Sequence, residues 1–116
     1  VLNANRQFFR DILQNLIDNS VKAMTESSQK VIRCSYEVQN EMLEILVSDT
    51  GVGIPHEDWE QVFALYYTTT EKQGGAGVGL YIVKTRVQSL GGSVAVVDSE
   101  FGEVGTTIKI TIPFKK

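Results

Sequence analysis

Two glycine-rich turns in this chain have residue types that suit opposite ends of a nucleotide. The first is Asp49-Thr50-Gly51-Val52-Gly53-Ile54, and the second is Gly75-Ala76-Gly77-Val78-Gly79-Leu80. A carboxylate repels phosphate but accepts a hydrogen bond from an exocyclic amine, so Asp49 belongs near a base. Alternate glycines leave backbone N–H groups unobstructed, and such a concavity suits phosphate oxygens. The two turns together predict a nucleotide-binding domain.

The spacing of the second turn excludes the two commonest phosphate-binding loops. A dinucleotide-binding fingerprint needs a third glycine three residues after Gly77, where this chain has Leu80. A P-loop over residues 74–79 would have to continue with Lys and then Ser or Thr. The next residues are Leu80 and Tyr81. Neither of these phosphate-binding mechanisms is therefore supported.

On the predicted first helix, polar side chains recur at spacings of three and four opposite an apolar stripe. They are Asp11, Asn15, Asp18, Asn19 and Lys22. This spacing places the amides of Asn15 and Asn19 one helical turn apart on one edge. A side-chain amide oxygen is a good ligand for Mg²⁺, which also keeps waters and phosphate oxygens around it. We therefore predict that this pair of residues binds a nucleotide-associated Mg²⁺.

The elements that position these residues follow from hydrophobic periodicity. Apolar residues that recur at three and four positions predict an amphipathic helix over 5–25, and shorter helices are predicted over 57–63 and 78–90. Apolar alternation predicts strands over 30–38, 42–48, 93–98 and 106–114, with turns at 39–41, 91–92 and 99–105. Residues 66–76 show no period and predict a mobile loop. This order predicts an α/β fold: a two-layer sandwich of a mixed, mostly antiparallel sheet with three helices on one face.

Length and composition limit the classes of protein to consider. The 116 residues suit a single domain, 1–116, and the net charge of −3 without a basic stripe argues against nucleic acid as a partner. No stretch approaches the roughly 18 apolar residues of a membrane span, so we expect no membrane contact by this domain. The single cysteine, Cys34, fits a cytoplasmic location. The chain does not begin with Met, and we expect it to be part of a longer protein. That parent protein could be membrane-anchored outside this domain.

Taken in order, these motifs resemble those of the catalytic ATP-binding domain of bacterial sensor histidine kinases. Segment 15–20 resembles their N box and segment 49–55 their first glycine box. Phe63 with residues 66–69 resembles the F box and the start of the ATP lid, 75–80 the second glycine box, and 105–113 the closing strand. The resemblance implies the Bergerat fold, which these kinases share with type II topoisomerases, Hsp90 and MutL proteins. The chain departs from the pattern at Leu65, where Pro is common, and at Ser20, where Ala is frequent.

The same resemblance implies a function and a set of residues. It implies a protein-histidine kinase of a two-component system. Such a domain binds Mg-ATP and donates the γ-phosphoryl group to a histidine on a separate dimerisation domain upstream. A response regulator is then a further partner. It implies that Asp49 binds the adenine amine and that Asn15, Asn19 and Lys72 act in catalysis, with Asn15 and Asn19 as the metal ligands. The nucleotide-binding residues are then Asn19, Lys22, Asp49, Gly51, Gly53, Ile54, Tyr67, Thr68, Gly75, Gly77, Val78, Gly79, Leu80 and Thr106.

Three other functions stay open at this point. A hydrolysing ATPase of the topoisomerase, Hsp90 or MutL kind carries a Glu one turn before the residue that Asn19 matches. Asn15 stands there instead, and an amide cannot act as a general base for water. An anti-sigma-type serine kinase shares the fold without a dimerisation helix in its chain, and a nucleotide-binding module without transferase activity would keep Asn19, Asp49 and Gly79. The only histidine, His56, follows Ile54-Pro55 in a predicted turn, so we expect it to be a surface residue and not the phosphoacceptor.

Overall fold

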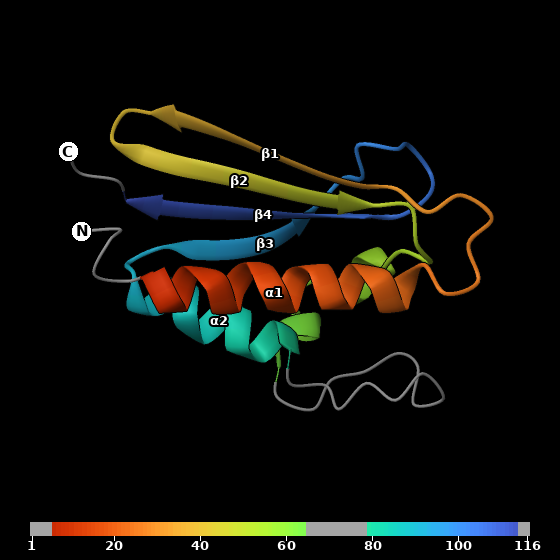
Figure 1. The fold of residues 1–116 in the computed structure, drawn as a ribbon, viewed down its shortest axis with the longest axis horizontal. Coiled ribbons are helices and arrows are strands. Elements are labelled where there is room, and N and C mark those ends of the chain that lie inside the picture. Colours follow the sequence, from red (N-terminus) through yellow and green to blue (C-terminus); the bar gives the residue numbers. More distant parts are fainter. Residues whose placement is uncertain (1–5, 65–78, 114–116) are drawn as a thin grey trace.

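The computed structural model describes residues 6–64 and 79–113, and every structural statement below concerns those residues. A sheet forms one layer and both α-helices form the other (Figure 1), which confirms the predicted two-layer α/β sandwich. The elements are α1 (Arg6–Ala23), β1 (Ile32–Gln39), β2 (Met42–Asp49), the 3₁₀ helices η2 (His56–Asp58) and η3 (Gln61–Phe63), α2 (Gly79–Ser89), β3 (Ser93–Val97) and β4 (Thr106–Pro113).

The sheet has the order β1-β2-β4-β3, and each described pair of neighbouring strands is antiparallel, where a mixed sheet was expected. The hairpin between β1 and β2 turns at Asn40 and Glu41, both with positive φ, as a two-residue hairpin loop requires. The helix predicted over 57–63 is instead the two short turns η2 and η3. Its backbone bonds span three residues, since the Trp59 N–H donates to the carbonyl oxygen of His56 and the Ala64 N–H to that of Gln61, as in 3₁₀ turns.

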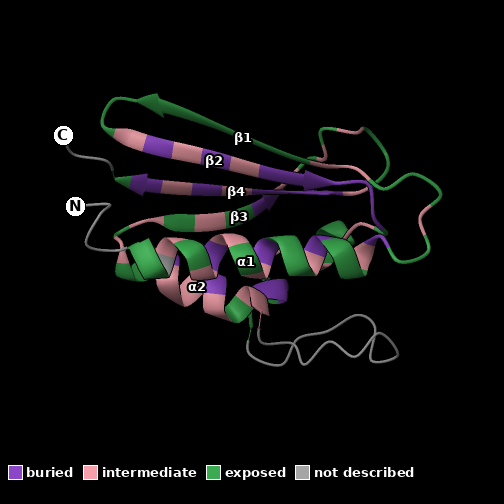
Figure 2. Cartoon of the chain, viewed as in Figure 1, coloured by how far each residue is buried: buried purple, intermediate pink, exposed green. Residues whose placement is uncertain are grey.

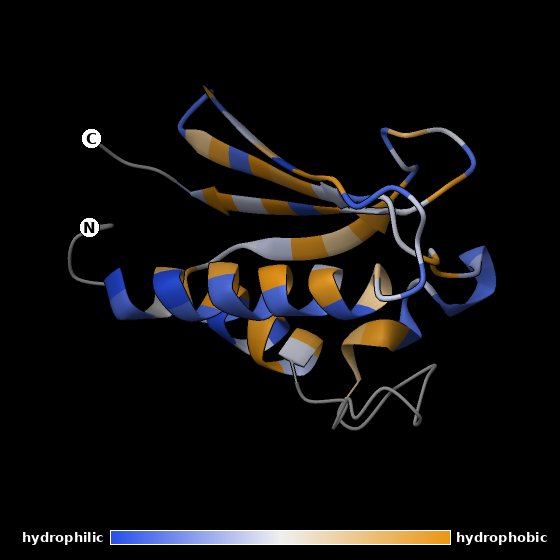
Figure 3. Ribbon diagram, turned by 45° about the vertical axis from the view of Figure 1, so that its right-hand side comes forward, coloured by the Kyte–Doolittle hydropathy of each residue, from blue (hydrophilic) through white to orange (hydrophobic). Residues whose placement is uncertain are grey.

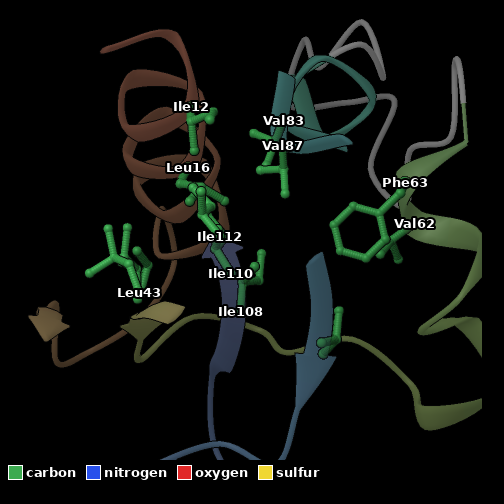
Figure 4. Close-up of a cluster of buried hydrophobic side chains, with 13 residues drawn as sticks. Ile12, Leu16, Leu43, Val62, Phe63, Val83, Val87, Ile108, Ile110 and Ile112 are labelled. Carbon is green, nitrogen blue, oxygen red and sulfur yellow. The ribbon is translucent and has the colours of Figure 1, made fainter. Parts of the chain in front are cut away.

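The core lies between the helices and the inner face of the sheet. The face of α1 that points at the sheet is apolar, and its opposite face is polar (Figure 3). Side chains from α1, α2, η3, β2 and β4 meet there (Figure 4). The largest fully buried ones are Ile12, Leu16, Ile110, Ile112, Val83 and Val87. From Met42 to Val47 along β2, inward residues are buried more deeply than outward ones (Figure 2), as expected for an antiparallel sheet that is covered on one face.

Part of the predicted apolar stripe of α1 is not in this core. The Ile17 side chain is 37% exposed and that of Val21 is 55% exposed. Helix α1 packs mainly against α2 and less against β2, and this side of the helix stays partly open to solvent. Strand β1 itself is exposed along nearly its whole length, including Tyr36. No helix in the described part of the chain is long and apolar enough to cross a membrane.

Two glycines let the chain close tightly around the end of β2. A Cβ placed on Gly51 would lie 2.6 Å from the carbonyl oxygen of Ala23 at the end of α1. The next residue fixes this approach, because the Val52 N–H donates to that same oxygen over 3.1 Å. A Cβ on Gly105, which has φ +82°, would overlap the carbonyl oxygen of Asp49. The end of α1, the end of β2 and the start of β4 therefore meet with backbone against backbone.

This close packing predicts different outcomes for two glycines in the same loop. Gly102 and Gly105 both have positive φ, but a Cβ on Gly102 would meet nothing within 4 Å. We expect Gly102→Ala to lower the free energy of unfolding by about 1–2 kcal/mol, the cost of a left-handed backbone. Gly105→Ala should cost a further ~1–3 kcal/mol for overpacking. Urea unfolding followed by the fluorescence of the single tryptophan, Trp59, measures both, and equal losses would contradict the close approach at Gly105.

Candidate nucleotide-binding site

Asp49, the last residue of β2, is a buried carboxylate with only 3% of its surface exposed. Its Oδ1 accepts the Gly51 N–H over 2.8 Å. The Ser20 side chain and the Thr106 backbone also lower the pKa of this carboxylate. Among the described residues Asp49 has no ion-pair partner. Its charge is therefore balanced by hydrogen bonds alone.

Burial dominates the electrostatics of this carboxylate. It raises the pKa of Asp49 above the ordinary value of 3.8, and the hydrogen bonds from Gly51, Ser20 and Thr106 oppose that rise only in part. A folded-state pKa above the unfolded one means that protonation favours folding. This stabilising contribution is complete below the unfolded pKa and is lost as pH rises through the raised folded pKa. Burial of the charged form of Asp49 thus opposes folding, as often happens with residues of a functional site.

The turn after Asp49 is anchored by Thr50. Its hydroxyl donates to the carbonyl oxygen of Gln29 over 2.6 Å and accepts the Val31 N–H over 3.0 Å. The Thr50 N–H in turn donates to the carbonyl oxygen of Val31 over 3.2 Å. These bonds tie the first glycine turn to the segment between α1 and β1, so the position of Asp49 is fixed from its C-terminal side.

A second polar cluster holds the loop between β3 and β4 against the outer face of the sheet. The buried hydroxyls of Ser48 and Thr107 lie 2.8 Å apart. The Ser48 hydroxyl also donates to the Glu100 carboxylate over 2.5 Å, and the Glu100 N–H donates to the Thr107 hydroxyl over 3.0 Å. Because this loop leads into Gly105 and Thr106, the cluster keeps both residues beside Asp49.

The predicted asparagine pair lies on α1 near the start of α2. Asn15 is half-buried, and its Nδ2 donates to the carbonyl oxygen of Asp11 over 2.7 Å. Its Oδ1 would lie 3.5 Å from a Cβ placed on Gly79, the first residue of α2. The structure thus brings Asn15 against the last glycine of the second glycine turn. Asn19 is half-buried one turn further along α1, and its amide has no hydrogen-bond partner among the described residues.

An ion pair connects the two helices beside Asn15. Arg86 on α2 lies 3.4 Å from the carboxylate of Asp11 on α1, measured from Nε to Oδ2. Gln7 also donates to this carboxylate over 3.0 Å. The position of α2 relative to the asparagine pair is therefore set by contacts between the helices.

The other predicted residues in the described part of the chain have varied surroundings. Gly53 has φ +79°, and a Cβ there would lie 3.1 Å from the carbonyl oxygen of Gly105. Ile54 and Leu80 are partly buried and pack on the core, whereas Lys22 is exposed in the last turn of α1. The predictions for Tyr67, Thr68, Lys72, Gly75, Gly77 and Val78, and for the loop 66–76, fall outside the described residues.

Aromatic side chains lie beside the first glycine turn. The Trp59 indole N–H donates to the carbonyl oxygen of Ile54 over 3.0 Å. The His56 ring lies 4.5 Å from that of Trp59, centroid to centroid. His56 is exposed at the start of η2, which confirms the prediction of a surface residue. Trp59 packs against the core.

Two other features of the described residues do not form part of this site. A cavity on the outer face of the sheet is lined by residues near the β1–β2 hairpin, such as Glu37, Asn40 and Met42. It lies at the opposite end of β2 from Asp49. No group of three or more His, Cys, Asp or Glu side chains in the described segments could hold a metal ion.

Sequence reasoning missed the residues that hold Asp49 in place. Ser20 was noted only as a departure from a family pattern, although one signal was available. It lies four residues after Leu16 and eight after Ile12, on the buried side of the helix, where a polar group needs a partner. The Ser48–Thr107–Glu100 cluster gave no such signal, because its members are brought together only by strand pairing and loop folding.

Known proteins match this arrangement closely. Residues 4–116 match the family described as histidine kinase-, DNA gyrase B-, and HSP90-like ATPases. Sensor histidine kinase WalK of Bacillus subtilis (strain 168) is 39% identical over 109 residues, which cover 90% of this chain and 18% of WalK. The chain thus spans less than a fifth of that relative.

Solved structures agree with the sequence match. The nucleotide-free catalytic domain of histidine kinase ThkA superposes with a TM-score of 0.79 and 26% identity, covering 94% of this chain and 68% of that one. Full-length ShkA in complex with AMPPNP gives a TM-score of 0.74 and 30% identity, covering 94% of this chain and 22% of ShkA. The family model, the relative and the fold agree, and the chain belongs to the family of histidine kinase-, DNA gyrase B- and HSP90-like ATPases.

Proposed function

We propose that this domain binds Mg-ATP and donates its γ-phosphoryl group to a histidine on a separate dimerisation domain of the parent chain, from which a response regulator then receives it. The similarity to sensor histidine kinases supports this function. The single observation that carries it is the buried carboxylate of Asp49, which lacks an ion-pair partner among the described residues and begins the first glycine turn, with Gly105 packed against its backbone. An exposed free thiol, Cys34, and the use of ATP fit a cytoplasmic location.

Asp49 is the residue that would recognise the base. An ionised carboxylate only accepts hydrogen bonds, so it pairs with the exocyclic amine of adenine and repels a carbonyl oxygen at that position. Gly51 and Gly53 present bare backbone next to it. Ile54, which is partly buried beside them, would cover one face of the ring.

The phosphates would lie at the start of α2. The N-terminus of a helix attracts anions through its unpaired N–H groups and its dipole, and α2 begins at Gly79. The residues there fit Mg²⁺: the Asn15 Oδ1 is directed at Gly79 and the Asn19 amide is one turn away. Amide oxygens are hard ligands of the kind Mg²⁺ accepts beside phosphate and water. When bound, the ion would neutralise charge on the phosphate oxygens.

Transfer to a protein side chain fits these residues better than hydrolysis. Asn15 stands where a hydrolysing relative would need a general base, and its amide is already bonded to the Asp11 carbonyl. Phosphoryl transfer depends mainly on positioning and charge stabilisation. His56 is an exposed residue in a turn, and its ring makes a tilted contact with that of Trp59, so we expect the phosphoacceptor to be another histidine.

One labelling experiment separates this function from its alternatives. The full parent chain is incubated with ATP labelled at the γ-phosphate, and the products are treated with acid and with base. A protein-bound label that acid removes and base does not is the expected result. An acid-stable label would indicate a serine kinase, and free phosphate without labelled protein a hydrolysing ATPase. Bound nucleotide with neither product would indicate a module without transferase activity.

The proposed base recognition predicts that Asp49→Asn weakens ATP binding much more than folding. The loss of a charge-assisted hydrogen bond should cost about 1.5–3 kcal/mol of binding free energy. The free energy of unfolding should change by no more than ~1.5 kcal/mol, because relief from burying a charge offsets the loss of an acceptor. Calorimetric titration and urea unfolding measure the two effects. A folded variant with unchanged ATP affinity would remove Asp49 from the adenine site, and GTP should bind poorly to the wild type.

The proposed metal site predicts that Mg²⁺ strengthens ATP binding through Asn19. The affinity for ATP is compared with Mg²⁺ and with a chelator in the wild type and in Asn19→Ala. We expect the variant to lose about tenfold or more of the gain from the metal. The matched control is Gln14→Ala, which removes an exposed amide of the same helix that bonds Asp18. If Mg²⁺ helps all three proteins equally, Asn19 is not a ligand.

A further inference from the structure

Trp59 lies between the two 3₁₀ helices and donates a hydrogen bond to the first glycine turn. Its side chain is partly buried and packs against the core. Its backbone N–H donates to the carbonyl oxygen of His56 over 3.2 Å, and η3, which follows, is anchored by the buried Val62 and Phe63. The indole N–H of a buried tryptophan usually has a hydrogen-bond partner. Here that partner is the carbonyl oxygen of Ile54, 3.0 Å from the indole nitrogen.

This bond fixes the last residue of the glycine turn. Thr50 anchors the start of the turn, and the Val52 N–H ties its middle to the end of α1. Ile54 follows Gly53, whose φ of +79° is a backbone conformation that glycine adopts easily. In the described part of the chain, the bond from the indole is the only hydrogen bond of Ile54. The backbone position of Ile54 therefore depends on Trp59.

We propose that Trp59 is a positioning residue for the base: its indole N–H holds the Ile54 backbone, so that the Ile54 side chain packs on one face of adenine. This inference rests on the proposed function, in which Asp49 meets the exocyclic amine and Ile54 covers the ring. Trp59 acts through Ile54 and needs no contact with the nucleotide.

The indole ring and the indole N–H have separable effects. Phenylalanine can share the packing of the ring, but it lacks the donor. Without the donor, the Ile54 carbonyl would turn toward water, because Ile54 is only half-buried and an unpaired carbonyl is costly to bury. That rotation would move the Ile54 side chain away from the base. The approach of Asn15 to Gly79 at the phosphate end does not involve Trp59, so the loss is expected at the base end alone.

The test removes the donor in two ways and measures binding by calorimetric titration. One variant is Trp59→Phe. Because Trp59 is the single tryptophan, the chain is also made with benzothienylalanine in place of tryptophan, which keeps the bicyclic ring and replaces the N–H by sulfur. This second protein retains the packing of the ring, so the test stands even where Trp59→Phe folds poorly.

We expect both proteins to bind ATP and adenosine about three- to tenfold more weakly than the wild type, with the same factor for the two ligands. Adenosine lacks the phosphates, so an equal factor locates the loss at the base end. A structural effect that reached the start of α2 would weaken ATP more than adenosine and would overturn the inference.

The matched control is His56→Ala. It removes the exposed ring that lies 4.5 Å from that of Trp59 and leaves the indole donor in place. Its affinities for ATP and adenosine should stay within about twofold of the wild-type values.

A double-mutant cycle with Ile54→Ala identifies the path of the effect. If Trp59 acts through the Ile54 side chain, the donor matters only while that side chain is present. We expect the benzothienylalanine replacement to cost less than about twofold in the Ile54→Ala protein, because the two changes are coupled. A general loss of stability would instead add to the effect of Ile54→Ala, and additive losses would overturn the role of Trp59.

Two comparisons separate this inference from the proposed function. Unchanged affinity in both proteins that lack the donor, together with weakened ATP binding by Asp49→Asn, would overturn the role of Trp59 and leave the proposed function standing. Unchanged ATP binding by Asp49→Asn would instead overturn the base recognition on which this inference rests.

Discussion

A buried carboxylate that must stay charged is the constraint on which this end of the molecule depends. Removal of Asp49 from water favours its neutral form, and the hydrogen bonds it accepts compensate only in part. The Gly51 N–H donates to it over 2.8 Å, and α1 and β4 carry the other two groups that lower its pKa, Ser20 and Thr106. The arrangement of α1, the first glycine turn and β4 therefore favours the charged form of Asp49, which can accept hydrogen bonds.

This requirement extends through the rest of the sheet. The register between β2 and β4 places Asp49 opposite Thr106 and Ser48 opposite Thr107. At this end the paired positions are therefore acid and hydroxyl side chains, whereas further along the same two strands Ile45 pairs with Ile110. Polar burial of this kind contributes little to stability. The apolar core must therefore supply the stability that the site does not. The core and the site both use residues of β2 and β4.

The parts of the fold that depend on local pattern could be predicted from the sequence, and the parts that depend on tertiary contacts could not. Strand alternation and helical periodicity located the main elements, and the glycine turn identified Asp49. Ile17 and Val21 share the apolar periodicity of α1 but are exposed, because which side of a helix is covered depends on what packs there. The contact between Ser20 and Asp49, and the direction of the Asn15 amide, depend on how α1 sits on β2 and α2.

Helix α1 connects the two halves of the proposed site. Its last turns carry Ser20 and Ala23, which contact Asp49 and the first glycine turn. One turn earlier it carries Asn15, directed at the start of α2. The rise from Asn15 to Ser20 along an α-helix is about 7.5 Å, and a helix resists changes in that length. The distance between the base end and the phosphate end is therefore fixed by one rigid element, whereas the sheet holds only the base end. A movement of α2 relative to α1 would alter the phosphate end and leave base recognition unchanged.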